Sequence, residues 1–291
     1  MERTFETPGG VRLYVDNQVG LVVVTARATG TTVVSLEADT PGGDELVERA
    51  TVGCRPWGDG HVVAVKVPHL HGMRFLRRNA VTVRVEVPEG GQVTVVTASA
   101  DIEIDGPVGE ADVKTGSGDI STDDVAADVT AKTASGTITM GRVGGDIRAQ
   151  TASGDLRCSS VAGAAEFSTA SGDLEVGAVG SRVEVKATSG SVRLGELARG
   201  ARVVNVSGSV RVLALGEGTL HVRSVSGDVA VGVAKDVDLH VDVETVSGSV
   251  HSDIPLNEAP APGQRPETRV ALSVRSVSGN VEIGRALEHV A

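Results

Sequence analysis

The sequence predicts an all-β chain whose C-terminal two-thirds forms a single-stranded parallel β-solenoid, a right-handed coil with about ten rungs of about 18 residues. Three observations predict this fold class. A Ser-Gly-polar-aliphatic tetrad recurs along the chain, aliphatic residues alternate in phase with it, and aromatic residues make up only 2% of the sequence. Stacked Val, Ile, Leu and Ala can fill a narrow solenoid core without aromatic rings.

The tetrad sets the period of the repeat. Its copies begin at Ser117, Ser135, Ser153, Ser171, Ser189, Ser207, Ser226, Ser247 and Ser278, and a degenerate copy with Ala100 in place of Gly begins at Ser99. The spacing is 18 residues up to Ser207, and then 19, 21 and 31 residues. A fixed period of this kind is the signature of a stacked repeat protein.

Positions of equal parity around each tetrad are aliphatic, which predicts strands with one face inward. The fourth tetrad position gives one inward ladder, with Ile120, Ile138 and Leu156 as successive members. A further apolar position is expected to fill the return corner: Val125, Val143, Val161, Val179, Leu197 and Leu215. Threonines two residues before the Ser share the inward parity: Thr97, Thr115, Thr133, Thr151 and Thr169.

The handedness is predicted from the absence of a six-residue aliphatic period. A left-handed hexapeptide helix also has 18-residue coils, but it requires an aliphatic residue at every sixth position. Gly144 and Gln150, which lie six and twelve residues after Ile138, are not aliphatic. This pattern favours the right-handed coil.

The chain divides into three predicted regions. Residues 1–90 lack the tetrad but read as strands between turn signals, which predicts an N-terminal β cap over the first rung. Residues 91–284 form the solenoid, with a Pro-rich loop insertion at 253–269, and residues 285–291 form a tail.

Composition narrows the partners and the compartment. The net charge of −11 argues against nucleic acid and anionic membranes as partners. The N-terminal residues lack a signal-peptide pattern, no apolar run has membrane-spanning length, and Cys54 and Cys158 form no Cys-x-x-Cys pair. We therefore expect a cytoplasmic protein without direct membrane insertion, and an envelope-associated location is the alternative.

The units Thr-Ala-Ser-Gly-Asp-Leu and Ser-Val-Ser-Gly-Asp-Val resemble those of the bacterial β-strand-repeat "putative adhesin" family, which is related to the toastrack domains of envelope-stress systems. The likeness covers residues 91–284. The resemblance implies a β-solenoid scaffold and transfers no catalytic residue to this chain.

The sequence predicts no catalytic, cofactor-binding or metal-binding residues. Asp101, Asp119, Asp155, Asp173 and Asp228 follow the corner Gly, where we expect turn capping rather than calcium binding. His69 and His71 could chelate a metal, but a solvated loop explains them better. The rungs lack the long loops that enclose a sugar in β-helix lyases and hydrolases, so we expect no enzyme and no small-molecule substrate.

One ladder predicts an interaction surface. The residue before the motif Ser is small in the first repeats and becomes Val206, Val225, Val246 and Val277 in the later ones. Its parity points outward, so these valines would form an apolar stripe of the kind that marks a contact surface. Two structural alternatives compete: the corner turns the valines into the core, or residues 253–269 cover them.

The sequence therefore predicts a non-catalytic solenoid scaffold or protein-binding module, which binds a protein partner or a second copy of itself. An envelope-associated adhesin-like or stress-sensing module is the alternative, and a carbohydrate-active β-helix enzyme is a remote one.

Overall fold

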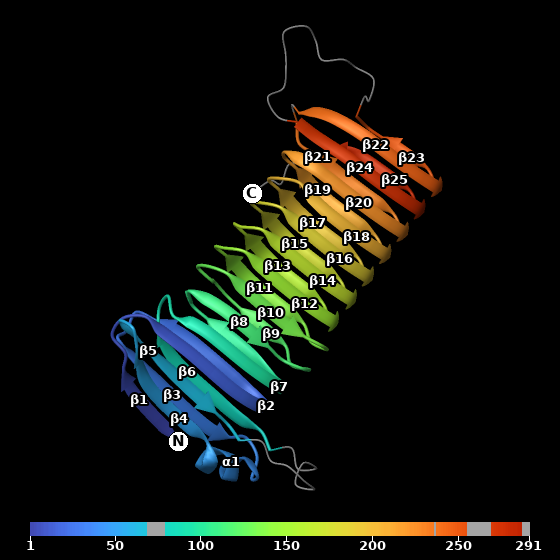
Figure 1. Cartoon of the computed structure of the whole chain (residues 1–291). Helices are drawn as coiled ribbons and strands as arrows, with labels where there is room; N and C mark the ends of the chain where they lie inside the picture. Colours follow the sequence, from blue (N-terminus) through green and yellow to red (C-terminus); the bar gives the residue numbers. More distant parts are fainter. Residues whose placement is uncertain (69–78, 236, 255–268, 287–291) are drawn as a thin grey trace. The chain divides into compact units, whose positions relative to one another are not determined.

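The computed structural model describes residues 1–68, 79–235, 237–254 and 269–286 (Figure 1). Contacts group the chain into two units. Unit 1 comprises residues 1–145 and 149–151, and unit 2 comprises residues 146–148 and 152–291. The boundaries predicted at residues 90 and 284 stay predictions.

Unit 1 contains β-strands and one short helix. Its elements are β1 (Glu2–Glu6), β2 (Val11–Arg27), β3 (Thr31–Ala38), α1 (Gly43–Arg49), β4 (Thr51–Trp57), β5 (Gly60–Lys66), β6 (Val81–Pro88), β7 (Gln92–Asp105), β8 (Glu110–Lys114), β9 (Ile120–Thr122), β10 (Val129–Thr133) and β11 (Ile138–Val143). Strand β12 (Ile147–Ser153) is divided between the two units.

The repeats of unit 1 stack in register and in parallel. Strands β8 and β9 pair with the two halves of β7, and β10 and β11 pair with β8 and β9. Ile120 and Ile138 are register partners, and both are buried. The predicted ladder is therefore confirmed within this unit.

Strand β2 is a rung that the tetrad search did not find. It pairs in parallel with β7 along both halves, and its own halves pair with β5 and β6. The register sets Asn17 opposite Thr97 and Gly20 opposite Ala100, so Asn17 to Gly20 occupies a motif corner without the Thr-x-Ser-Gly sequence. Asn17 donates a 2.8 Å hydrogen bond to the Val81 carbonyl.

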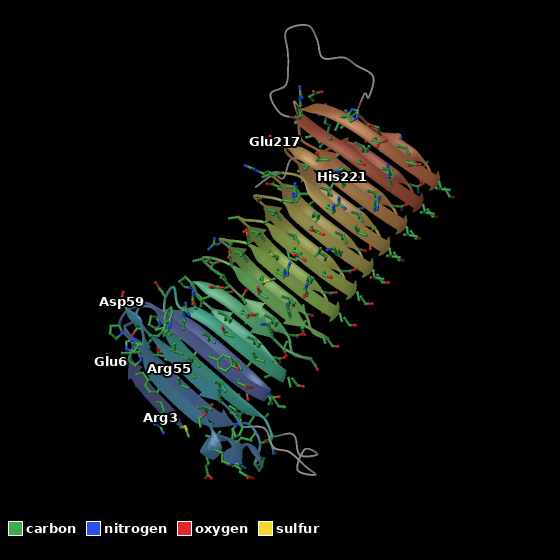
Figure 2. All side chains as sticks on the ribbon, in the orientation of Figure 1. Arg3, Glu6, Arg55, Asp59, Glu217 and His221 are labelled. Carbon is green, nitrogen blue, oxygen red and sulfur yellow. The ribbon has the colours of Figure 1, made fainter. Side chains whose placement is uncertain are left out.

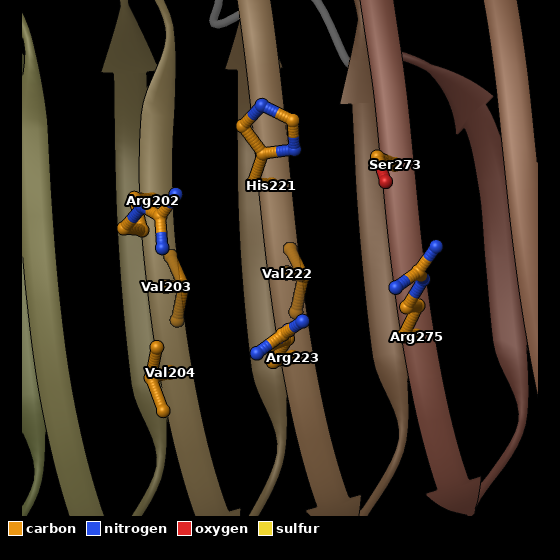
Figure 3. Close-up of a pocket in the computed structure, with 8 residues that line it drawn as sticks. All are labelled: Arg202, Val203, Val204, His221, Val222, Arg223, Ser273 and Arg275. Atoms are coloured by element: carbon orange, nitrogen blue, oxygen red, sulfur yellow. The ribbon is translucent and has the colours of Figure 1, made fainter.

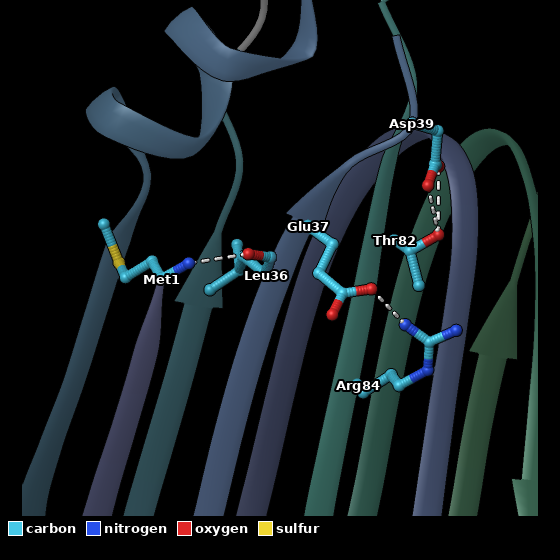
Figure 4. Close-up of polar contacts among 6 residues, drawn as sticks. All are labelled: Met1, Leu36, Glu37, Asp39, Thr82 and Arg84. Carbon is cyan, nitrogen blue, oxygen red and sulfur yellow. Dashed lines mark hydrogen bonds and ion pairs between the residues drawn. The ribbon is translucent and has the colours of Figure 1, made fainter.

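Antiparallel strands complete unit 1. Strand β3 pairs with β6 and β1, and β4 pairs with β5. Figure 4 shows the polar contacts among them: the Met1 amino group donates to the Leu36 carbonyl at 2.8 Å, and Thr82 donates to Asp39 at 2.8 Å. Arg84 and Glu37 form an exposed ion pair across β6 and β3 at 2.8 Å.

Unit 2 consists of two facing walls of parallel strands. The first wall contains the strands that precede each motif Gly: β14 (Ala165–Ser171), β16 (Val183–Ser189), β18 (Ala201–Ser207), β20 (Gly218–Ser226), β22 (Asp238–Ser247) and β24 (Arg269–Ser278). The second wall contains the strands that follow it: β13 (Leu156–Val161), β15 (Leu174–Val179), β17 (Val192–Leu197), β19 (Val210–Leu215), β21 (Val229–Val233), β23 (Val250–Ser252) and β25 (Val281–Arg285).

The core lies between the two walls. In the second wall Leu156, Leu174, Val192 and Val210 are successive register partners, and each is at most 1% exposed. The return-corner residues from Val125 to Leu215 are all buried, as predicted. The five threonines of the predicted ladder are also buried, and Thr97, Thr115, Thr133 and Thr151 donate to backbone carbonyls of the corner.

The last rungs do not follow the order of the sequence. Strand β24 pairs with β20 on one side and with β22 on the other, and β25 likewise pairs with β21 and β23 (Figure 1). The final repeat therefore lies inside the stack, and β22 with β23 forms its last rung. The period predicts the register but does not predict this order.

Candidate functional site

The candidate site is the outer face of the first wall in unit 2. Strand alternation directs Val203 and Asn205 into the core, where they are buried, and leaves Val204 and Val206 on the outer face. The same alternation repeats in β20, β24 and β22. Because the rungs are in register, equivalent outward residues form ladders across the strands.

The predicted valine stripe lies on this face. Val206, Val225, Val277 and Val246 are 43%, 48%, 50% and 79% exposed. Their stacking order is 206, 225, 277, 246, because β24 lies between β20 and β22. The corner does not turn these valines into the core. The alternative of a covering loop falls on residues 255–268, which are outside the described residues.

The stripe borders a groove of about 410 Å³. Its other walls include Val204, Arg223, Arg275 and Glu244, which form the next outward ladder. Arg275 and Glu244 form an ion pair at 3.7 Å, and both side chains are more than half exposed. The groove therefore combines an apolar side with a charged side.

A second groove, of about 270 Å³, adjoins the first (Figure 3). Arg202, His221 and Ser273 form one row along it, and Val204, Arg223 and Arg275 form the next. A third hollow, of about 610 Å³, continues from Arg202 and His221 to the corner residues Arg182 and Arg199. Figure 2 shows His221 on this face and Glu217 at the corner that precedes β20.

The part of this face over β18, β20 and β24 differs in charge from the whole chain. The chain carries a net charge of −11, whereas Arg202, Arg223 and Arg275 lie on three adjacent strands of the face. At one border Glu184 accepts a hydrogen bond from Lys186 at 2.9 Å. That bond, with a smaller contribution from nearby Arg202, lowers the pKa of Glu184. This arginine-bearing part of the face is therefore suited to carboxylates, which arginine binds through paired N–H groups.

Sequence reasoning missed these arginines, although a signal was present. Arg202 and His221 share one repeat position, as do Arg223 and Arg275, and both positions have the outward parity of the valines. A ladder-by-ladder comparison of outward positions would have found them.

The corner aspartates bind the backbone of the next rung. Asp101 accepts from the Asp119 amide at 2.9 Å, Asp155 from the Asp173 amide at 3.0 Å, and Asp173 from the Ser191 amide at 2.8 Å. Asp228 accepts from Asn280 in the same way, at 2.8 Å. The aspartates therefore cap backbone amides at the corners, and each capped amide belongs to the neighbouring rung and not to the turn of the aspartate itself.

Other candidate chemistry is limited within the described part of the chain. No group of three or more His, Cys, Asp or Glu residues there could hold a metal ion. His69 and His71 lie outside the described residues. Burial raises the pKa of Cys158 to about 11, which keeps it protonated and disfavours its action as a nucleophile. Within the described ranges no helix has the length and apolar character needed to cross a membrane.

The family model of the Toastrack domain, DUF4097, matches residues 59–284, which is more than half of the chain. The chain belongs to the Toastrack DUF4097 family. This membership agrees with the resemblance found in the repeat motifs and with the observed β-solenoid.

Solved structures are similar over nearly the whole length. A "putative adhesin" from Bacteroides fragilis is 12% identical, with coverage of 97% of this chain and 96% of that one and a TM-score of 0.40. A "putative adhesin" from Parabacteroides distasonis is 9% identical, with coverage of 97% and 96% and a TM-score of 0.40. A "putative cell adhesion protein" from Clostridium sporogenes is 9% identical, with coverage of 98% and 99% and a TM-score of 0.27. No curated protein matches the chain.

Proposed function

We propose that this Toastrack protein is a non-catalytic binding module, and that the valine stripe with its arginine rows is its docking face for a protein partner. The observation that supports this most directly is the exposure of four stacked valines beside three arginines on the outer face of one wall. An exposed apolar patch rimmed by charge is typical of interaction surfaces.

The chemistry of the face defines the partner. Aliphatic side chains fit the valine groove, and carboxylates fit Arg202, Arg223 and Arg275. These arginines form a local positive patch on a chain whose net charge is negative. The patch favours an acidic partner segment over a basic one. We therefore expect a segment that carries aliphatic residues beside Asp or Glu.

The test substitutes two valines that lie away from the end of the stack. In a Val206→Lys, Val225→Lys variant the partner captured by the wild-type chain from native cells should be lost, while the circular dichroism spectrum and Tm stay near wild type. The matched control is Ser121→Lys, Thr139→Lys, which adds the same charge at exposed positions of unit 1. Retention of the partner by the valine variant, or its equal loss from the control, would refute the docking face.

We also propose a cytoplasmic location. Cys158 is buried and Cys54 is half-buried as thiols, a state that reducing compartments preserve. Fractionation of native cells tests this proposal, because recovery of the protein with the envelope would support the adhesin-like or stress-sensing alternative.

A further inference from the structure

The last rung of unit 2 differs from the inner rungs in its burial. In β24 the inward residues Val270, Leu272 and Val274 are at most 1% exposed. Their register partners in β22 are Leu239, Val241 and Val243, and all three are only half-buried. In β23 Val250 is 47% exposed, although its partner Val281 in β25 is 1% exposed. Among the residues that the structure describes, nothing closes the apolar interior at this rung.

The backbone of β22 is also open on that side. The register pairs β22 with β24, and no other strand of the described ranges lies in register with it. An edge strand of ten residues offers a row of unpaired N–H and C=O groups to any extended segment. Natural edges are usually protected by an inward charge, a proline or a covering element. The inward positions of β22 hold Leu239, Val241, Val243 and Thr245, so none of them carries a charge.

The outer face of β22 selects the occupant by charge. It carries Asp238, Asp242 and Glu244. Two of these carboxylates form ion pairs with arginines of β24: Arg269 lies 3.7 Å from Asp238, and Arg275 lies 3.7 Å from Glu244. A strand on the free side meets the same carboxylates. A second copy of β22 there would add its own three acidic residues to them, and such like-charge pairs destabilise a sheet.

We propose that β22 accepts a β-strand from a partner protein, with aliphatic residues on its inward face and Lys or Arg on its outward face. The strand would add a rung to both the backbone ladder and the apolar interior, in the manner of β-augmentation. This site adjoins the docking face, with which it shares Glu244 and Val246 of β22, but it does not depend on that face, because its partner is basic and its contacts are with the strand edge.

The chain itself supplies a probe. A labelled peptide with the sequence of Arg269–Ser278 has the proposed alternation, and a Ser273→Lys version places a cation at the position opposite Asp242. We expect saturable binding of this peptide to the full chain by fluorescence anisotropy, and slower hydrogen exchange in β22 when it is bound. Absence of binding at millimolar peptide, or protection confined to other strands, would overturn the proposal.

A charge exchange tests the geometry. Asp242→Lys should weaken the Ser273→Lys peptide at least about fivefold and strengthen a Ser273→Asp peptide. Glu217→Lys is the matched control, because it makes the same charge change at an exposed corner position, and it should leave both affinities unchanged. Equal effects of the two variants would mean attraction by net charge alone and would refute a strand site. The Val206→Lys, Val225→Lys variant should bind the peptide normally, so failure of the docking face and failure of this site are distinguishable.

Other occupants give different results in the free protein. We expect a monomer by light scattering, in which the amides of β22 exchange faster than those of β20. A dimer with protected β22 would assign the edge to a second copy, and a monomer with β22 as protected as β20 would assign it to the chain itself. Either result contradicts the proposal.

Discussion

Single positions in this fold tolerate little change where the walls meet, because each inward side chain touches equivalents in the rungs on both sides. Most of these positions hold Val, Ile, Leu or Ala, and Phe167 is a buried ring among them. Corners are constrained by the backbone instead. At Gly172 φ is +142°, and a Cβ there would lie 2.1 Å from the Gly154 carbonyl oxygen.

Ile138→Asp should unfold unit 1. Ile138 is 0% exposed, so the substitution places a carboxylate in an apolar interior without a partner. We expect a loss of more than about 4 kcal/mol in the free energy of unfolding, measured by urea denaturation. Thr139→Asp, at the exposed neighbouring position, should change it by less than about 0.5 kcal/mol. Comparable losses for both would place Ile138 outside the core.

Gly172→Ala should destabilise unit 2 by about 3 kcal/mol, since it combines a left-handed φ with a backbone clash. Thermal unfolding measures the change. Gly30→Ala is the control, because no heavy atom lies within 4 Å of the Cβ added there. If the two variants unfold at the same temperature, the corner is less constrained than the structure shows.

The motif determines the register between neighbouring strands, but it does not determine the order in which the rungs stack. The 18-residue phase predicts in-register parallel pairing, the buried corner residues and the inward threonines. It cannot predict which rung lies next to which, because repeats such as those at Ser226, Ser247 and Ser278 present nearly the same edge to one another. The tetrad does not identify β2 as a rung, because Asn17 to Gly20 forms the corner with a different sequence.

The proposed docking face could be predicted from the sequence only in part, for the same reason. Outward parity located the valines, since alternation is a property of one strand. The arginine rows depend on which outward positions share a ladder, and the final order of β20, β24 and β22 depends on pairings between distant segments.

The aspartate ladder predicts a modest inter-rung contribution. Asp173→Ala removes the acceptor of the Ser191 amide and should lower the Tm by about 2 °C. Asp173→Asn keeps an acceptor oxygen and should stay near wild type. Calorimetry of the pair checks this, and a stabilised Ala variant would instead indicate that repulsion along the ladder dominates.

The same ladder predicts that calcium does not change the stability, because a backbone amide of the next rung already occupies one oxygen of each of these carboxylates. Millimolar calcium or chelator should leave the Tm unchanged. A rise of several degrees with calcium that is lost in an Asp155→Ser, Asp173→Ser variant would show a bound ion, since a ligand of the native state alone must stabilise it.

For the whole molecule, stability is expected to be a sum of neighbouring contacts, as in other repeat proteins. A chain that ends at Ile254 lacks β24 and β25, so β20 and β21 lose one neighbour each. We expect faster hydrogen exchange in β20 and β21 and unchanged exchange in unit 1. A chain that ends at Ala286 is the control. Loss of protection throughout both units would mean that the molecule unfolds as one cooperative body.

The inner position of β24 also bears on how the protein is made. A ribosome releases β22 and β23 before β24 and β25, so most rungs can join the stack in the order of synthesis. The last two cannot, because β24 must come to lie between β20 and β22. Until β24 has been translated, β20 presents a free edge that matches the nascent β22 in phase. The final arrangement of this end is therefore reached only after the chain is nearly complete, and a pause in translation between Ser252 and Arg269 would prolong the exposure of that edge.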